Sequence, residues 1–298
     1  MLSILIPVFN VDVRELVKDL NQQVSLIGID FEIRLYDDGS DAKYKSLTNE
    51  LAEIQSVIIQ DSDKNIGRSA IRNKLAKEAQ GDWLWFLDCD GKVAQNQNLS
   101  SVFWKEKSEN QIVSGGRIYQ YESPENTKLQ LHWLWGSQRE LLDSKARMKD
   151  PVSHFLSNNF IVHKGLFQKL SFDTLLFGYG YEDTLFAAEA KTKGFEVKHI
   201  ENPVLHDGLE PADAFLKKIE ESLDNLHRLK DICAEKNIQF PVKSKLILAY
   251  RILNFPIIRQ LFGSWFARNA SIWRIQLLGK NPDLKTFDAY RLAYLLNQ

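Results

Sequence analysis

The 298-residue chain contains only two cysteines, Cys89 and Cys233, too few for a disulfide framework or a thiolate metal site. Met1 leads directly into an apolar segment with no basic flank and no cleavage site, so we expect no signal peptide. No segment approaches the roughly 18 uncharged apolar residues that a membrane span requires. Internal repeats and low-complexity segments are also missing. These absences predict a globular protein of the cytoplasm.

Charge is distributed unevenly, although the net charge is only −1. The last 57 residues, 242–298, contain nine Lys or Arg and two Asp, a net charge of +7 that leaves −8 on residues 1–241. Aromatic and cationic residues alternate between 243 and 278, a pattern typical of helices lying on the inner face of the cytoplasmic membrane. Packing of these helices on the rest of the chain, or on a second subunit of a homodimer, stays open. Nucleic acid is not expected as a partner, because the acidic remainder would repel phosphate.

Apolar segments alternate with amphipathic ones along the first 110 residues or so, which predicts an α/β fold with a mostly parallel sheet and helices on both faces. We expect strands at residues 2–8, 31–36, 57–60 and 83–87, and helices beginning near 12, 43 and 68. The pattern is less regular afterwards. It predicts strands at 112–121, 158–163 and 195–200, a helix-rich segment at 129–149, and helices at 182–193 and 211–236.

Acidic residues follow several of the expected strands, at the edge of the sheet where ligands of such folds bind. Asp88 and Asp90 stand two apart directly after the strand at 83–87, and Gly91 lets the chain turn. Two carboxylates in this position can approach one hard cation and leave other coordination positions for water and diphosphate oxygens. A polar turn that merely ends the strand is the alternative.

Other motifs occur in a fixed order around this pair. They are Asp37-Asp38-Gly39-Ser40, Asn65-x-Gly67-Arg68-x-x-x-Arg72-Asn73, Gly178-Tyr179-Gly180-Tyr181-Glu182-Asp183 and His206-Asp207. Over about the first 210 residues, the ordered set resembles the family 2 glycosyltransferases. The resemblance implies a GT-A nucleotide-diphospho-sugar transferase fold, with a Rossmann-like, mostly parallel mixed sheet in a catalytic domain (1–240) and a basic, aromatic-rich helical extension (241–298). It also implies inverting transfer of a sugar from a UDP-linked donor to a saccharide or lipid-linked saccharide in bacterial surface glycan assembly.

The resemblance assigns roles to individual residues. A divalent cation, Mn²⁺ or Mg²⁺, would be held by Asp90, Asp88 and His206, with Asp90 the more direct ligand. The donor would be bound by residues at the ends of the first strands and along the third helix: Pro7, Phe9, Asp37, Asp38, Asn65, Gly67, Arg68, Arg72 and Asp88. An arginine beside the diphosphate offsets its charge.

The acidic pair Glu182-Asp183 would face the acceptor. An inverting transfer needs a base on the acceptor hydroxyl, and we assign this role to Asp183, with Glu182 orienting the acceptor. The reverse assignment stays open. Further acceptor contacts would come from Asn158, Asn159 and Trp135, while Tyr181, where relatives often have His or Trp, leaves the acceptor's identity open.

Two other functions compete with glycosyl transfer. A nucleotidyltransferase that makes sugar nucleotides would need a glycine-rich phosphate loop after the first strand, and Pro7-Val8-Phe9-Asn10-Val11 contains no glycine. A catalytically silent protein that only binds nucleotide sugars would have no need for Asp88, Asp90 and Asp183. The acidic residues therefore favour the transferase.

Overall fold

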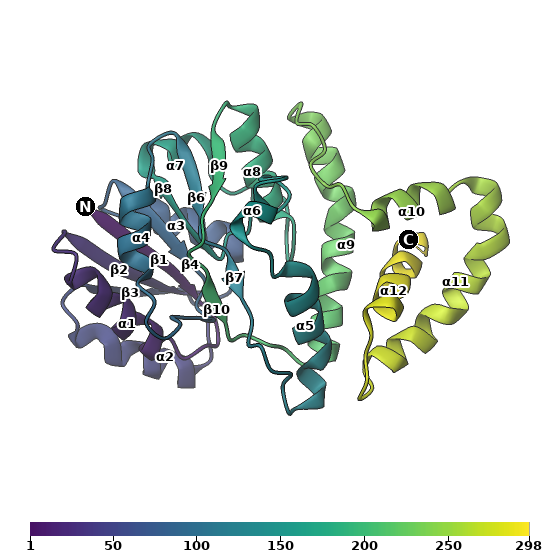
Figure 1. The fold of residues 1–298 in the computed structure, drawn as a ribbon, viewed down its shortest axis with the longest axis horizontal. Helices are drawn as coiled ribbons and strands as arrows, with labels where there is room; N and C mark the ends of the chain where they lie inside the picture. The colour runs from purple at the N-terminus through teal and green to yellow at the C-terminus, as the bar shows by residue number, and fades with distance from the viewer. Residues whose placement is uncertain (298) are drawn as a thin grey trace. The chain divides into compact units, whose positions relative to one another are not determined.

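The computed structural model describes residues 1–297, and for residues 257–262 the backbone alone. The chain forms two compact units (Figure 1). The sheet unit comprises Met1–Ile118, Leu142–Phe177 and Glu182–Gly208. The helical unit comprises Tyr119–Leu141, Gly178–Tyr181 and the chain from Leu209 onward. The division predicted from the sequence, 1–240 and 241–298, stays a prediction about domains.

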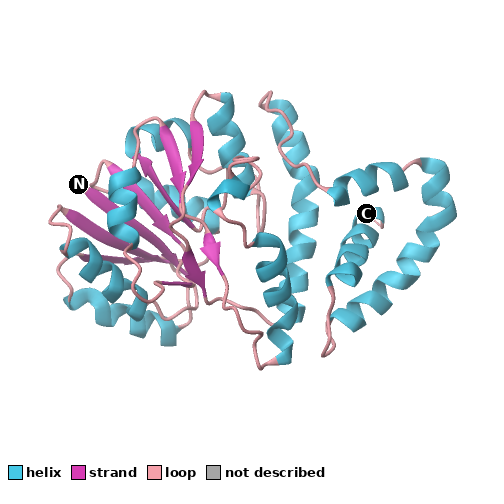
Figure 2. Cartoon of the chain, viewed as in Figure 1, coloured by secondary structure: helices cyan, strands magenta, loops and turns pink. Residues whose placement is uncertain are grey.

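The sheet unit is built on a seven-stranded sheet, drawn as magenta arrows in Figure 2. Its order is β3 (Val57–Asp61), β2 (Phe31–Asp37), β1 (Leu2–Val8), β4 (Trp83–Leu87), β8 (Asn159–His163), β6 (Gln111–Ser114) and β9 (Glu196–His199). Only β8 is antiparallel to its neighbours within this sheet, so the sheet is mixed and mostly parallel, as predicted. A small second sheet has the order β5 (Gly91–Lys92), β10 (Val204–His206) and β7 (Arg117–Ile118).

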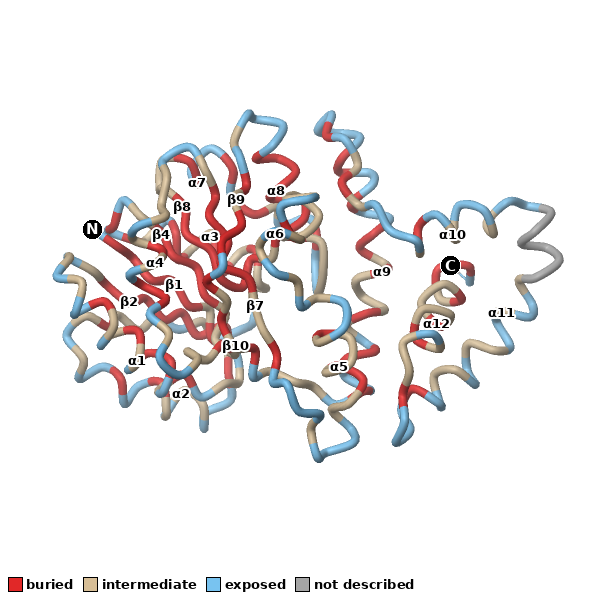
Figure 3. The backbone as a smooth tube through the Cα atoms, viewed as in Figure 1, coloured by how far each residue is buried: buried red, intermediate tan, exposed pale blue. Residues whose placement is uncertain are grey.

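Helices cover both faces of the large sheet, because successive side chains along a strand point to opposite faces. Ile4 and Ile6 of β1 pack in one apolar cluster with helices α1 (Arg14–Ser25) and α4 (Leu99–Glu106). Leu5 lies in the cluster on the other face, with α3 (Arg68–Glu78), α7 (Lys164–Leu170) and α8 (Glu182–Thr192). The central strands β1, β2, β4 and β8 are accordingly buried along almost their whole length (Figure 3).

The expected strand at 112–121 is divided in the structure, and that prediction is wrong in detail. β6 ends at Ser114 and β7 begins at Arg117 in the other sheet. A side chain at Gly115 would approach the Asn202 backbone oxygen to 2.3 Å, and Gly116 has a φ of +84°. The two glycines thus let the chain leave one sheet for the other. The shorter elements of the sheet unit are α2 (Ala42–Asn49), the 3₁₀ turn Glu50–Glu53 and α6 (Ser144–Arg147).

The helical unit has its own apolar core. It contains the 3₁₀ turn Thr127–Leu129, α5 (Gln130–Trp135), the π turn Gly136–Glu140, α9 (Ala212–Glu235), α10 (Lys245–Leu253), α11 (Pro256–Leu277) and α12 (Leu284–Leu296). Phe215, Ile219 and Leu223 on one face of α9 pack with Leu131 and Phe287. Pro256 separates α10 from α11, as its missing N–H predicts. Within the described residues, no helix has both the length and the apolar character needed to cross a bilayer.

Candidate active site

The ends of β1 and β2 are joined by a set of short hydrogen bonds. Val8 stands opposite Asp37 in the parallel register, and its carbonyl oxygen accepts a bond of 2.8 Å from the Asp38 N–H. Beyond the strands, the Asn10 N–H donates to Ser40 Oγ at 2.8 Å, and Asn10 has a φ of +53°. The carboxyl ends of the two strands, and the polar residues that follow them, therefore form one rigid edge.

Asp37 and Asp38 hold the loops of this edge. Asp37 is 1% exposed, and its Oδ1 accepts from the N–H groups of Gly39 (3.1 Å) and Ser40 (2.7 Å). Its other oxygen, Oδ2, is buried and makes no hydrogen bond within the described part of the chain. The Asp38 carboxylate instead accepts hydrogen bonds from a neighbouring loop. The predicted contact of Asp37 and Asp38 with the nucleoside stays a prediction, and a nucleoside would reach Asp37 Oδ2 only if the residues that cover this oxygen moved.

Asp38 fixes the loop that leads into α3. Its two carboxylate oxygens accept from the N–H groups of Ile66 (2.7 Å) and Gly67 (3.1 Å). Burial raises the pKa of Asp38, although these two bonds oppose the rise. A Cβ at Gly39 would lie 2.9 Å from the Asn65 backbone nitrogen, so the two loops touch through their main chains. The Asn65–Gly67 segment is thus positioned by Asp38 and Gly39, and Arg68 follows it as the first residue of α3.

Two arginines one turn apart on α3 contact the predicted acidic residues. Arg72, 2% exposed, donates to Asp88 Oδ1 at 2.7 Å and lies 3.7 Å from Glu182 Oε1. Arg68 donates to the same Glu182 oxygen at 3.3 Å. Four residues from three distant segments of the sequence therefore form one charged cluster. The spacing of Arg68 and Arg72 at i and i+4 places both on the same side of the helix.

The two acids that begin α8, Glu182 and Asp183, have different surroundings, which shift their pKa values in opposite directions. Burial alone would raise the pKa of Glu182, but the charges of Arg68 and Arg72 outweigh it and hold this pKa below its usual value. For Asp183, burial and the negative charge of Glu182 raise the pKa to about 7. One Asp183 oxygen accepts from the Thr184 N–H at 2.7 Å. Asp183 can therefore hold or release a proton near neutral pH, while Glu182 stays ionised.

Asp90 and His206 face each other across the small sheet. β5 pairs with β10 so that His206 stands opposite Gly91, and His206 Nδ1 lies 3.6 Å from Asp90 Oδ1. Burial would raise the pKa of Asp90, but His206, Arg117 and Arg68 lower it far below its usual range. A Cβ at Gly208 would come within 2.5 Å of Asp90 Oδ2, so glycine is needed for this carboxylate to keep its place.

The chemistry of this pair fits a divalent cation that arrives with a diphosphate. A carboxylate and an imidazole are both ligands of Mn²⁺, and such ions often keep positions for water and substrate phosphate. Asp88, the other predicted ligand, is engaged by Arg72. Among the residues the structure describes, no three His, Cys, Asp or Glu side chains are grouped closely enough to hold a metal ion by themselves. The protein would thus supply two ligands, and the donor the others.

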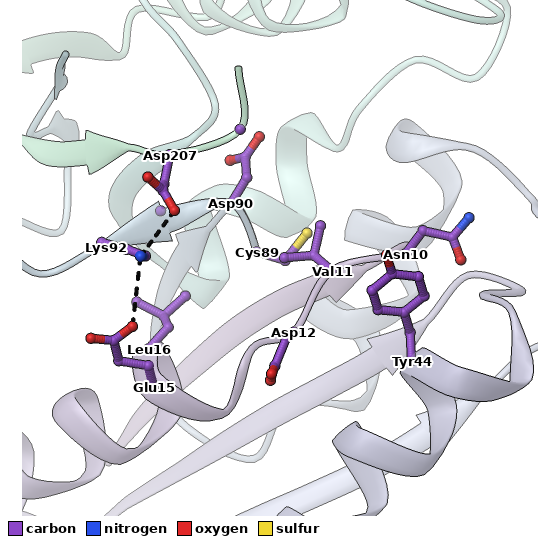
Figure 4. A pocket seen from close by; sticks show the side chains of 12 residues that line it. Asn10, Val11, Asp12, Glu15, Leu16, Tyr44, Cys89, Asp90, Lys92 and Asp207 are labelled. Atoms are coloured by element: carbon purple, nitrogen blue, oxygen red, sulfur yellow. Dashed lines mark ion pairs between the residues drawn. The ribbon is translucent and has the colours of Figure 1, made fainter. Parts of the chain in front are cut away.

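A pocket of about 250 Å³ adjoins Asp90 (Figure 4). It is lined by Asn10–Asp12, Glu15 and Leu16, by Tyr44 of α2, by Cys89–Lys92 and by Asp207 and Gly208. Lys92 closes one side through ion pairs with Asp207 (3.0 Å) and Glu15 (3.7 Å). Cys89 is half-buried, and desolvation by the surrounding protein raises the pKa of its thiol to about 12; it forms no disulfide.

The two predicted acceptor asparagines have different surroundings. The Asn159 side chain is fully buried, accepts from Trp85 Nε1 at 3.1 Å, and donates to the carbonyls of Gly116 (3.2 Å) and Asn202 (2.9 Å). Acceptor contact through Asn159 would require some of these bonds to break. The Asn158 Oδ1 atom is buried and makes no hydrogen bond with the described residues. Of the two, Asn158 has the unused polar capacity.

The remaining predicted residues lie at other places. Phe9 follows β1 and is 47% exposed, so its ring is available for stacking, and Pro7 is part of β1 itself. Trp135 belongs to the helical unit, where its ring packs edge-on against Phe287 and its Nε1 donates to Glu140 at 3.1 Å. Its predicted acceptor role stays a prediction.

The sequence interpretation missed two parts of this site. Arg117 of β7 acts electrostatically on both Asp90 and Asp183, but no motif surrounds it. The Lys92–Asp207 ion pair joins residues that are 115 positions apart in the printed sequence. The His206-Asp207 motif offered the one available signal for Asp207. Arg117 and Lys92 are identified as part of this site only by the pairing of β5, β7 and β10.

Comparison with known proteins identifies a family and agrees with the fold. The model of the family described as Glycosyl transferase family 2 matches residues 3–171, more than half of the chain. An uncharacterized glycosyltransferase of Haemophilus influenzae is 30% identical over 133 residues. That match covers 40% of this chain, and the chain spans only 42% of that relative's length.

Solved structures share the fold at low sequence identity. The mannosyltransferase PcManGT of Pyrobaculum calidifontis, in complex with GDP-Man and Mn²⁺, has a TM-score of 0.55 and 13% identity, covering 99% of this chain and 85% of its own. Residues 1–349 of S. aureus TarS in complex with UDP have a TM-score of 0.50 and 16% identity, covering 98% and 90%. These likenesses show a GT-A-like fold. The family match over residues 3–171 shows that the chain belongs to glycosyl transferase family 2.

Proposed function

We propose that this protein is an inverting glycosyltransferase that moves a sugar from a nucleoside-diphosphate sugar to a saccharide or lipid-linked saccharide. The observation that carries the proposal is the Asp183 carboxyl, whose pKa of about 7 suits proton transfer. It begins a helix beside Glu182, which Arg68 and Arg72 bind. Family membership and the two relatives' bound nucleotides, GDP-Man and UDP, support a nucleotide-sugar donor.

Asp183 is proposed to be the catalytic base. Its ionised carboxylate accepts the proton of the acceptor hydroxyl as the oxygen forms the new glycosidic bond and the nucleoside diphosphate leaves. Glu182 is bound by both arginines, so its negative charge stays in place and keeps Asp183 basic enough for this step. The reaction should therefore slow as the pH falls below about 7, the value at which Asp183 becomes protonated.

The donor is proposed to lie against Arg68, Arg72 and the Asp90–His206 pair. Arginine can bind phosphate oxygens in a forked geometry, and either residue could exchange part of its bond to a carboxylate for one to the diphosphate. Asp90 and His206 would hold a divalent cation, which when bound offsets charge on the leaving diphosphate. The phenyl ring of Phe9 and the buried Asp37 Oδ2 are the proposed contacts of the nucleoside.

The test is calorimetric titration with UDP, GDP and their sugar conjugates, with and without Mn²⁺, followed by an assay of sugar release. Donor binding that Mn²⁺ strengthens, and that Asp90→Ala weakens, is expected. Asp183→Asn should bind the donor like the wild type and transfer no sugar. If no nucleotide sugar binds, or if Asp183→Asn transfers sugar normally, the proposal fails. Donor binding without any transfer across a panel of saccharide and lipid-linked acceptors would instead favour a silent binding protein.

A further inference from the structure

Helix α10 of the helical unit exposes apolar side chains along one side. Leu248 and Ile252 are four residues apart and are 61% and 55% exposed, and Phe255, which follows the helix, is 64% exposed. Residues at this spacing lie above one another on a helix surface. Exposed cations, Lys245 and Arg251, lie three residues before and after Leu248. The helix therefore presents an apolar stripe with positive charge beside it.

Helix α11 repeats this arrangement. Trp265, Ile272 and Ile275 are 53%, 56% and 72% exposed, at positions i, i+7 and i+10. The exposed Arg268 lies three residues after Trp265 and four before Ile272, within the same stripe. The Trp265 ring also contacts Trp273, with ring centroids 5.6 Å apart. Arg259 and Phe262, which belong to the predicted basic aromatic tail, lie outside the described side chains.

The charge of this segment is of one sign. Residues 236–282 contain eight Lys or Arg and no Asp or Glu, so the segment carries +8 while the rest of the chain carries −9. Large apolar surfaces left exposed usually mark a binding site. Cations among aliphatic and aromatic side chains complement a surface whose headgroups are anionic and whose interior is apolar.

We propose that α10 and α11 dock this protein on the surface of an anionic lipid bilayer. The helices would lie along the headgroups, with Ile252, Ile272 and Trp265 entering the acyl boundary and the cations at the phosphates. A symmetric pairing with a second copy would place the same +8 segment against itself, which opposes association. The docking does not depend on the reaction proposed for the sheet unit.

The first test is co-sedimentation of the full chain with sucrose-loaded vesicles. Vesicles of phosphatidylcholine and phosphatidylglycerol in equal parts should bind the protein, and pure phosphatidylcholine vesicles should bind it far more weakly. Salt well above the physiological concentration should release it, because screening shortens the reach of the cations. Equal binding to both vesicle types, or no binding to the anionic ones, overturns the proposal.

Two sets of variants test separately how much the cations and the apolar side chains contribute to vesicle binding. Reversal of three exposed cations should lower the partition coefficient at least about 100-fold, since each contributes about 1 kcal/mol near an anionic surface. The substitutions are Lys245→Glu, Arg251→Glu and Arg268→Glu, with Lys77→Glu, Lys128→Glu and Lys191→Glu as a control of equal charge elsewhere on the surface. An equal loss of binding in the control would show that only the net charge of the protein attracts it to the vesicles, and would refute the proposal.

The apolar part is tested with the charges intact. Ile272→Asn combined with Ile275→Asn should weaken binding to anionic vesicles at least tenfold, whereas the control Leu26→Asn with Leu175→Asn, also exposed, should not. Unchanged circular dichroism spectra show that both variants fold. Sedimentation velocity tests the alternative, in which a second copy of the chain covers this surface. A wild-type dimer that the isoleucine variant dissociates, together with absent vesicle binding, would assign the surface to self-association.

Discussion

Replacing Asp183 by Asn should stabilise the protein, and increasingly so as the pH rises. The ordinary pKa of this carboxyl is 3.8, and burial next to Glu182 raises it to about 7 in the folded chain. Below 3.8 the carboxyl is protonated in both the folded and the unfolded protein, and it then costs nothing. As the pH rises from there through about 7, the unfolded chain releases the proton more readily, so the wild type loses stability. Asn keeps the carbonyl oxygen that accepts from Thr184 and removes the titration.

The expected magnitude follows from the shift. One pKa unit corresponds to about 1.4 kcal/mol, so the full shift corresponds to about 4 kcal/mol above pH 7. The Asp183 side chain is partly exposed, and screening by water reduces this to about 2 kcal/mol. Asn should therefore raise the free energy of unfolding by about 2 kcal/mol at pH 8, and by less than about 1 kcal/mol at pH 5.

Urea unfolding of both proteins at pH 5, 6, 7 and 8 or so measures this difference from the transition midpoints. The control is Asp30→Asn, at an exposed aspartate, which should change the midpoint little at any of these pH values. A stability difference that does not grow with pH, or an Asp183→Asn variant that is less stable at pH 8, would refute the raised pKa. The role of Asp183 as a base would then lose its electrostatic support.

Three further predictions test the site. Arg72→Met removes the ion pair of Asp88 and leaves Glu182 with Arg68 alone, and should cost about 3 kcal/mol of stability, measured by urea unfolding; a change below about 0.5 kcal/mol would show that the cluster is solvated. Asn159→Ala removes three buried hydrogen bonds and should cost about 3 kcal/mol, whereas Asn158→Ala should cost clearly less, and thermal unfolding that ranks them in the opposite order contradicts the assigned contacts. Gly208→Ala should displace the Asp90 carboxylate and weaken Mn²⁺-dependent nucleotide binding about tenfold in calorimetry, a loss of about 1.4 kcal/mol, and unaltered affinity would mean that this carboxylate does not contact the cation.

The local elements were determined by the sequence itself. Apolar runs ended by polar residues fixed β1 and β4, and the spacing of Leu16, Leu20 and Val24 fixed α1, because burial of one face suffices to select these structures. The start of α1, predicted near residue 12, lies two residues later, at Arg14 after the cap Val13. The ordered polar strand ends likewise identified the family. Each of these features depends only on residues near one another in the chain.

Tertiary structure alone decided which partners the polar residues have. Asp88 and Asp90 stand only two residues apart, yet the first is bound by Arg72 of α3 and the second faces His206 of β10, because the fold brings different elements to each. Glu182 and Asp183 are adjacent acids, but only Glu182 forms ion pairs with Arg68 and Arg72, so their pKa values move in opposite directions. Electrostatic interactions depend on distance and burial rather than on residue type. Spacing along the chain could therefore identify the acidic residues, but their ion pairs and protonation follow only from the tertiary structure.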